Sequence, residues 1–169
     1  ERIGVDAAPH AALDVIAEGK ASAARARLGV RFDRHDYGQH AVAARLVSTQ
    51  PHQNTARQWF LSPEVLALLP FDPPQAMHGF GLVWSVPSER ARALMAMPVQ
   101  AFEAALNDAT QGAAGVLSLA SERATWPLSI GRADRVAGAG WVLVGDAAHQ
   151  VHPLAGQGLN LGLGDVSAL

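Results

Sequence analysis

Carboxylates, two histidines and five glycines are concentrated in the segment VLVGDAAHQVHPLAGQGLNLGLGD, residues 142–165. Residues 141–144 are all apolar and predict a strand buried on both faces, and Gly145 and Asp146 follow it directly. Glycine lets the chain turn and lets a ligand approach the backbone closely, and a ligand binds beyond the carboxyl end of such a strand. A carboxylate at Asp146 can therefore accept hydrogen bonds from sugar-type hydroxyl groups.

The residues after this turn predict a helix with an open N-terminus. Gly156 and Gly158 leave the first N–H groups of the helix uncovered, and these groups carry the positive end of the helix dipole. Such a site favours a negatively charged or electron-rich group. A phosphate would fit, and so would a reduced flavin ring, which is anionic around N1 and the C2 oxygen.

The elements that must position this segment alternate along the chain. Residues 12–19 predict a short buried strand, and residues 22–30 begin as a helix with Ser22 as its N-cap. The middle of the chain predicts strands at residues 39–49, 55–62, 64–71, 80–87 and 118–130, with helices at 88–97, capped by Ser88, and 98–112. This order is typical of a nucleotide-binding layer interrupted by an inserted sheet.

Composition excludes several classes of protein. The 169 residues are 49% hydrophobic and 17% charged, which indicates a well-packed chain rather than a disordered one. A net charge of −2 gives no electrostatic footprint for nucleic acid, and the absence of cysteine excludes disulfides and thiolate chemistry. No apolar run approaches the roughly 20 residues of a membrane span. Because the sequence starts without methionine and stops within a predicted helix, we expect it to be a piece of a longer protein.

Two other kinds of site are disfavoured. His149 and His152 have a spacing that could bind a metal on a helix, but Pro153 and the glycines argue against a helix there, and no acidic third ligand is evident. No Gly-x-Ser-x-Gly elbow is present, so nothing indicates a hydrolase. We therefore predict no metal site, and the sequence offers no catalytic dyad or triad.

The combined string GDAAHxxxPxxGQGxNxGxxD resembles the second flavin-binding motif of the FAD-dependent aromatic hydroxylases, which are flavoprotein monooxygenases. The matching residues are Gly145, Asp146, Ala147, Ala148, His149, Pro153, Gly156, Gln157, Gly158, Asn160, Gly162 and Asp165.

Further stretches are similar to the ubiquinone-biosynthesis hydroxylase family. Residues 36–44 (DYGQHAVAA), 55–60, 66–70 and 83–85 look like its middle portion and follow in the same order. Residues 17–29 resemble the motif Asp-Gly-x-x-Ser-x-x-Arg, with Ser22 and Arg25 in place and Glu18 where the family has aspartate. That motif is associated in the family with the FAD pyrophosphate and with NAD(P)H.

The resemblance implies a fold and a division of the chain. The fold class is α/β (α+β), with a mixed β-sheet substrate domain inserted in a Rossmann-like FAD-binding domain that is only partly present. Residues 1–29 and 139–169 would belong to the FAD-binding domain, and residues 30–138 to the substrate-binding sheet. The family's strand-GxGxxG-helix unit does not occur in this sequence. We therefore expect these 169 residues alone to be inactive and to bind FAD poorly.

The resemblance also implies an activity. FAD, reduced by NAD(P)H or another electron donor, would hydroxylate an aromatic ring through a flavin C4a-hydroperoxide, in ubiquinone biosynthesis. The alternatives are a related hydroxylase of a soluble phenol, and a silent fragment that works only as a substrate-binding module. The enzyme would be cytoplasmic, with a membrane surface or a multiprotein biosynthetic complex as further partners.

Site residues follow from the same resemblance. Asp146 would hold the ribityl chain, and the N–H groups of residues 158–160 would face the pyrimidine edge of the ring. The expected cofactor contacts are Gly145, Asp146, Ala147, Pro153, Gly156, Gln157, Gly158, Leu159, Asn160, Glu18 and Arg25. The expected walls of the aromatic substrate site are Trp59, Phe60, Leu68 and Trp84, although apolar strand residues are more commonly core.

Overall fold

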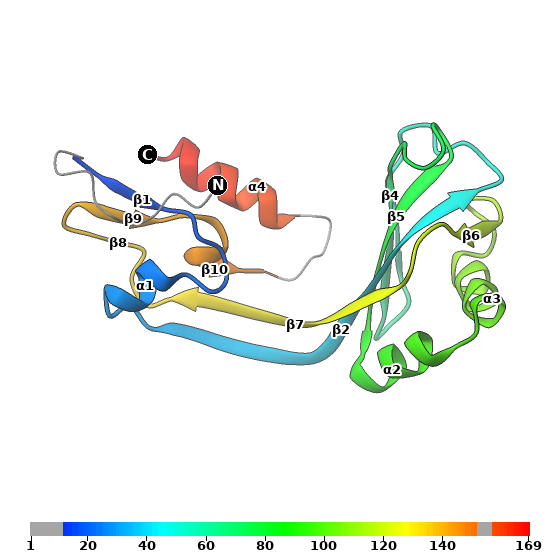
Figure 1. The fold of residues 1–169 in the computed structure, drawn as a ribbon, viewed down its shortest axis with the longest axis horizontal. Coiled ribbons are helices and arrows are strands. Elements are labelled where there is room, and N and C mark those ends of the chain that lie inside the picture. Colours follow the sequence, from blue (N-terminus) through cyan, green and yellow to red (C-terminus); the bar gives the residue numbers. More distant parts are fainter. Residues whose placement is uncertain (1–11, 152–156) are drawn as a thin grey trace. The chain divides into compact units, whose positions relative to one another are not determined.

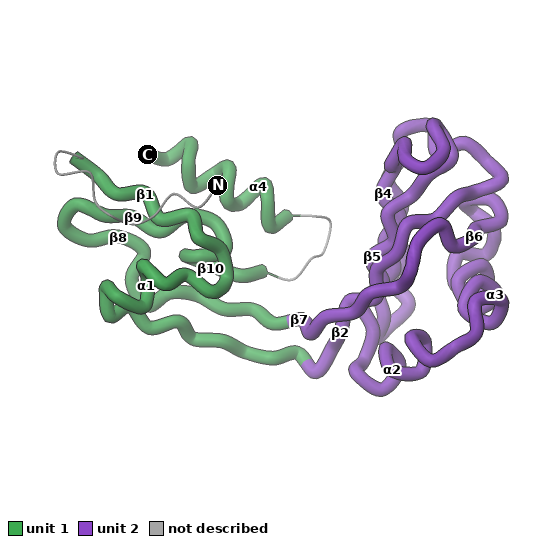
Figure 2. Tube along the Cα trace, viewed as in Figure 1, with its two compact units in different colours: residues 1–37, 129–169 green, residues 38–128 purple. Residues whose placement is uncertain are grey.

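A computed structural model describes residues 12–151 and 157–169 of the chain (Figure 1). It divides into two compact units, one made of residues 1–37 and 129–169 and the other of residues 38–128 (Figure 2). The division falls inside strand β2 (Phe32–Ser48) and inside strand β7 (Ala124–Ala133), because both strands continue from one unit into the other. The sequence prediction places these two boundaries at 29/30 and 138/139, outside both strands.

The first unit contains a small three-stranded sheet. Its strands are β1 (Asp14–Ile16), β9 (Trp141–Leu143) and β8 (Ala137–Gly138), in the order β1-β9-β8. β1 runs parallel to β9, which joins the two ends of the sequence, and β8 pairs with β9 in the antiparallel sense. Leu143 and Val144 are buried as predicted, but Trp141 and Val142 are only half-buried. Trp141 lies over Gly138, where a Cβ would come within 2.5 Å of its indole nitrogen.

Helix α1 (Ala23–Arg27) follows β1 and confirms the predicted cap. The Ser22 hydroxyl accepts a hydrogen bond from the Arg25 N–H at 3.1 Å, which satisfies one of the free donors at the start of the helix.

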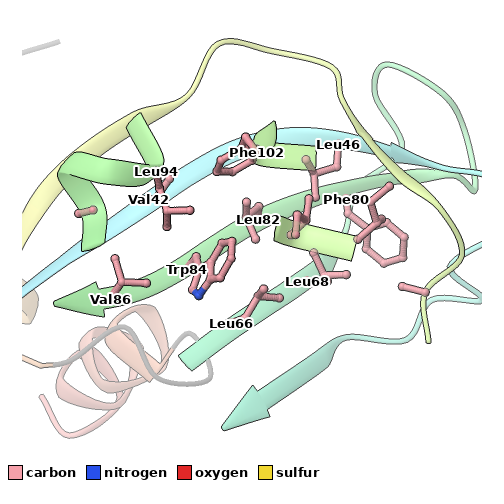
Figure 3. Close-up of a cluster of buried hydrophobic side chains, with 14 residues drawn as sticks. Val42, Leu46, Leu66, Leu68, Phe80, Leu82, Trp84, Val86, Leu94 and Phe102 are labelled. Carbon is pink, nitrogen blue, oxygen red and sulfur yellow. The ribbon is translucent and has the colours of Figure 1, made fainter. Parts of the chain in front are cut away.

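A seven-stranded sheet has the order β10-β7-β2-β5-β4-β3, with β6 paired to β2. Its remaining strands are β3 (Arg57–Phe60), β4 (Val65–Pro70), β5 (Gly79–Pro87), β6 (Leu117–Leu119) and β10 (His149–Gln150). Helices α2 (Ser88–Ala96) and α3 (Val99–Thr110) cover the apolar face of the strands that form the second unit (Figures 1 and 3).

Two further local predictions are wrong. Ser88 does not cap α2: Pro87 is the N-cap, and the Ser88 hydroxyl instead donates to the Gly38 carbonyl oxygen at 2.8 Å. The single strand expected over residues 118–130 is two strands, β6 and β7, because Ser121–Arg123 turn the chain between them.

Candidate functional site

The Gly-Asp turn is held at the end of β9 by backbone hydrogen bonds. The Val144 N–H donates to the Ile16 carbonyl oxygen at 3.0 Å, which continues the pairing of β9 with β1. Gly145 then adopts φ +59°, a left-handed conformation that glycine reaches without strain. Residues Gly145–Ala147 form the short 3-10 helix η1, closed by a hydrogen bond from the Ala148 N–H to the Gly145 carbonyl oxygen at 2.9 Å.

Asp146 is half-buried within this turn. Among residues 12–151 and 157–169, no group forms a hydrogen bond or ion pair with its carboxylate. A half-buried carboxylate without a protein partner loses part of its hydration and recovers it by accepting hydrogen bonds from a ligand. Within the described residues, the Asp146 carboxylate thus has unused acceptor capacity, as the sequence prediction for this position requires.

Arg25 fixes the far side of the same turn. It is only 9% exposed, and its guanidinium donates to the carbonyl oxygens of Ala147 and Lys20, both at 2.9 Å. Its plane lies over the Phe32 ring, 4.1 Å from the centroid. The structure thus engages Arg25, an expected cofactor contact, with the main chain of the turn before α1 and of η1.

Glu18 serves α1 in a similar way. Its carboxylate accepts hydrogen bonds from the Ala24 N–H and from the Ser22 hydroxyl, both at 2.8 Å. These two bonds, the backbone bond first, hold the pKa of Glu18 below its ordinary value. Glu18 therefore acts as a second cap of α1, and an approaching cofactor would have to share it.

Helix α4 (Gln157–Ser167) confirms the helix predicted after the glycine-rich loop. Gln157, Leu159 and Asn160 are exposed, and the first turn of α4 carries no acidic side chain. The positive end of the helix dipole lies at this turn. Gly158 is half-buried. Pro153 and Gly156, which the sequence also assigns to the cofactor, lie outside the described residues.

Asp165, for which the sequence predicts no chemistry beyond its match to the motif, joins α4 to the turn. Its Oδ2 accepts from the Gly145 N–H at 2.7 Å and from His149 Nε2 at 2.8 Å. Desolvation raises the pKa of Asp165, but the hydrogen bonds from Gly145 and His149 outweigh it and hold that pKa below its ordinary value. The spacing of Gly158, Gly162 and Asp165 on one helix face is the signal that could have identified it.

A pocket of about 470 Å³ opens beside this network, within the first unit. Strands β2, β7 and β10 line it, and His149 and Arg132 are direct cross-strand partners in it. Ile130 and Val151 add apolar surface, and Val151 is the last residue described before α4. The pocket therefore combines apolar surface with imidazole and guanidinium groups, and with one carboxylate residue, Asp33.

Three of the four expected substrate-wall residues, Trp59, Leu68 and Trp84, meet in or against one hydrophobic core, and Phe60 lies outside it. Trp84 is 1% exposed and Leu68 0%, and both belong to the core beneath α2 and α3 (Figure 3). Trp59 pairs with Leu66 and packs against the edge of that core. Phe60 is 73% exposed. The sequence left open that these apolar residues belong to the core, and this is where Trp84 and Leu68 lie.

The described residues form neither a metal site nor a membrane-spanning helix. Residues 12–151 and 157–169 contain no group of three or more His, Cys, Asp or Glu side chains placed to hold a metal ion. None of the helices described is both long enough and apolar enough to cross a membrane.

Comparison with known proteins identifies a family and several relatives of this chain. The family described as FAD binding domain matches residues 3–169. The chain is 33% identical over 160 residues to the ubiquinone hydroxylase UbiL of Rhodospirillum rubrum, covering 95% of this chain and 36% of that protein. It is 34% identical to the human ubiquinone biosynthesis monooxygenase COQ6, covering 90% of this chain and 39% of that protein. The chain thus spans about two fifths or less of the length of these relatives.

Solved structures give the same fold. PqsL of Pseudomonas aeruginosa, in complex with 2-aminobenzoylacetate, superposes with a TM-score of 0.74 at 26% identity, over 92% of this chain and 43% of that chain. The flavin-dependent halogenase CmlS superposes with a TM-score of 0.68 at 19% identity, over 92% of this chain and 29% of that one, which is a likeness of fold alone.

Proposed function

Because this chain belongs to the FAD binding domain family, we propose that its Gly145–Asp146 turn and the first turn of α4 hold the flavin end of FAD in an aromatic-ring hydroxylase. The single observation that carries the proposal is the Asp146 carboxylate, which has no partner among the described residues and stands at the carboxyl end of β9. Identity of 33–34% to two ubiquinone-ring hydroxylases supports ubiquinone biosynthesis as the pathway.

The residues present fit the flavin end of FAD. Asp146 would accept hydrogen bonds from the ribityl hydroxyls, and Gly145 lets the ligand approach the backbone. The N–H groups of Gly158, Leu159 and Asn160 would donate to the electron-rich pyrimidine edge. Bound FAD supplies the redox chemistry and the oxygen activation that an aromatic hydroxylation needs. The chain's own task is to bind, orient and exclude water.

The proposed substrate is an aromatic small molecule, and the proposed electron donor is NAD(P)H. The pocket of about 470 Å³ beside His149 is large enough for a substituted benzene ring and has apolar walls at Ile130 and Val151. The prenyl tail of a prenylated ring would extend beyond the pocket, and such a substrate would favour binding of the enzyme to a membrane surface.

A soluble aromatic substrate is the second candidate. PqsL has 2-aminobenzoylacetate bound, and Arg132 offers this pocket a guanidinium for a ligand carboxylate. The third candidate, a folded module without activity, differs from both because it requires no flavin.

A hybrid enzyme tests the proposal. Residues 3–169 replace the matching segment of the Rhodospirillum rubrum hydroxylase, in a bacterium that lacks its own ubiquinone-ring hydroxylase. We expect the hybrid to retain FAD and to restore ubiquinone, measured by mass spectrometry. Asp146→Ala should lower FAD retention about tenfold or more, since it removes a charged acceptor.

The control is Asp108→Ala, which removes an exposed carboxylate from α3. It should leave FAD retention and ubiquinone unchanged. A folded hybrid that holds FAD but yields no ubiquinone would exclude the ubiquinone pathway, and oxygen uptake with soluble phenols would then support the second candidate. A folded hybrid without FAD would support the silent module.

A further inference from the structure

The face that α4 presents to the Gly-Asp turn is almost free of side chains. Gly158, Gly162 and Asp165 are the half-buried residues of α4, and its other residues are exposed. Their spacing places them on one face of the helix. A Cβ at Gly162 would lie 3.3 Å from the Gly145 Cα, so the two backbones nearly touch there. Asp165 is thus the one side chain that joins this face to the described part of the turn.

The Asp165 carboxylate binds two donors from the turn and the strand after it. An ionised carboxylate only accepts, so both the Gly145 N–H, at 2.7 Å, and His149 Nε2, at 2.8 Å, donate to it. These lengths are typical of charge-assisted hydrogen bonds. The bond to Gly145 holds the residue directly before Asp146.

The position of Asp165 is unfavourable for the helix itself. It lies in the last turn of α4, where the negative end of the helix dipole opposes a carboxylate. A residue type that destabilises the helix containing it indicates an interaction outside that helix. Here the interactions are the hydrogen bonds to Gly145 and His149.

We propose that Asp165 is a positioning residue of the cofactor site, whose carboxylate sets the separation between the Gly145–Asp146 turn and the N-terminal turn of α4. The inference rests on the proposed function, because these are the two elements assigned to the flavin. With the carboxylate in place, Asp146 and the first N–H groups of α4 converge on one ligand. Without it, the described residues provide no other hydrogen bond from the glycine face of α4 to the turn, and the two ligand-binding groups move independently.

The test is a titration of the ¹⁵N-labelled chain with FAD, followed through the backbone amide resonances. We expect Asp165→Ala to raise the FAD dissociation constant about tenfold or more and to accelerate hydrogen exchange of the Gly145 amide about tenfold. Asp165→Asn should have a smaller effect, since its amide oxygen still accepts from the Gly145 N–H. The matched control is Ser167→Ala on the same helix, where the hydroxyl donates only to the Leu163 carbonyl oxygen at 3.0 Å.

If Asp165 affected only the stability of α4, Asp165→Ala would change FAD affinity in the opposite direction. Alanine favours the helix and removes an unfavourable charge, so Asp165→Ala would then bind FAD equally or more tightly, and that result overturns the inference. If the spectrum shows that Asp165→Ala has lost its fold, Asp165→Asn carries the test. If the unmodified chain and the variants bind FAD equally, the positioning role of Asp165 is refuted, but the proposed function is not. An unmodified chain whose turn does not respond to FAD refutes the proposed function as well.

Discussion

At the scale of single residues, Arg25 shows how a charged side chain can serve a binding site without touching a ligand. Its guanidinium is buried and donates to the carbonyl oxygens of Ala147 and Lys20, so it ties α1 to the turn that carries Asp146. The Ser-x-x-Arg spacing from Ser22 singles out this arginine. The spacing cannot reveal that its partner is a carbonyl 122 positions away in sequence.

Arg25→Ala should destabilise the chain by about 2 to 4 kcal/mol, because it removes two hydrogen bonds from a charged donor and leaves the Ala147 carbonyl unpaired. Urea unfolding followed by circular dichroism measures the change. Arg27→Ala is the control, since Arg27 is exposed on the same helix, and it should change the stability by less than about 0.5 kcal/mol. Equal losses from the two variants would contradict the buried role.

Asp165 also makes a prediction about pH. Its pKa in the folded chain lies below the ordinary value of 3.8, so the stability it contributes is present above that value and is lost as the pH falls through the folded pKa. Unfolding midpoints measured between about pH 6 and pH 2 should therefore fall less steeply in Asp165→Asn than in the unmodified chain. Glu18 and Asp134 have lowered pKa values too, and the comparison isolates Asp165 because both proteins retain them. Parallel curves would exclude a stabilised Asp165 carboxylate.

At the scale of elements, α4 depends on where its glycines lie. Glycine in a helix interior costs about 1 kcal/mol of stability relative to alanine. A glycine is favoured there when it has a local reason, such as a neighbouring atom too close for a Cβ. Gly162 has one, because a Cβ there would lie 3.3 Å from the Gly145 Cα. Gly164 has none of this kind, since a Cβ would meet nothing within 4 Å.

The two glycines form a matched pair of variants. Gly164→Ala should stabilise the chain by about 0.5 to 1 kcal/mol through helix propensity. Gly162→Ala should lose that gain and weaken FAD binding, because the added methyl group pushes α4 away from the turn. Urea unfolding and FAD titration measure both effects. Equal stabilisation by the two substitutions would show that α4 does not pack closely on Gly145.

The strands and helices illustrate what the sequence can and cannot predict. Alternation of apolar and polar residues correctly predicts a strand over residues 39–49, which lies within β2, because a sheet with one covered face imposes a period of two. Short apolar runs bounded by turn residues correctly predict β4 and β5. The cap at Ser88 is wrong because its hydroxyl has a nearer partner in Gly38, which belongs to a strand 50 residues earlier. Local patterns therefore predict the elements, whereas hydrogen bonds between distant segments decide their ends.

The candidate site divides in the same way. The turn at Asp146 and the helix after it follow from local chemistry, and the structure forms both. The sequence predicts that Leu68 and Trp84 line a substrate site, but an apolar strand residue gives the same pattern whether helices or a ligand cover it. Their burial depends on α2 and α3, whose placement on that face of the sheet no local pattern records.

At the scale of the whole molecule, the described residues form two hydrophobic cores, one in each unit. The second unit packs α2 and α3 on its sheet around Trp84 and Phe102, whose ring centroids lie 6.3 Å apart. The first unit has its own cluster, which includes Ile16, Leu143 and Ala147. No residue belongs to both clusters, so we expect damage to one core to leave the site in the other intact.

Phe102→Ala tests this independence. Phe102 is fully buried, so its truncation should cost about 3 to 5 kcal/mol of stability. The FAD-induced shifts at Gly145 and Asp146 should be unchanged under conditions where the variant is folded. Val99→Ala, at a position of α3 that is 48% exposed, is the control and should cost little. Altered shifts at the turn in Phe102→Ala alone would show that the cores are coupled.

The central claim is that residues 145–149 and the first turn of α4 receive the flavin end of FAD. The most direct measurement compares FAD with ADP as ligands of the ¹⁵N-labelled chain. We expect weak FAD binding, with a dissociation constant on the order of 1 mM, because the sequence contains no GxGxxG unit. FAD should shift the amides of residues 145–149 and 157–161, and ADP should leave them in place. Shifts from ADP at the same amides, or FAD-induced shifts confined to other parts of the chain, would contradict the claim.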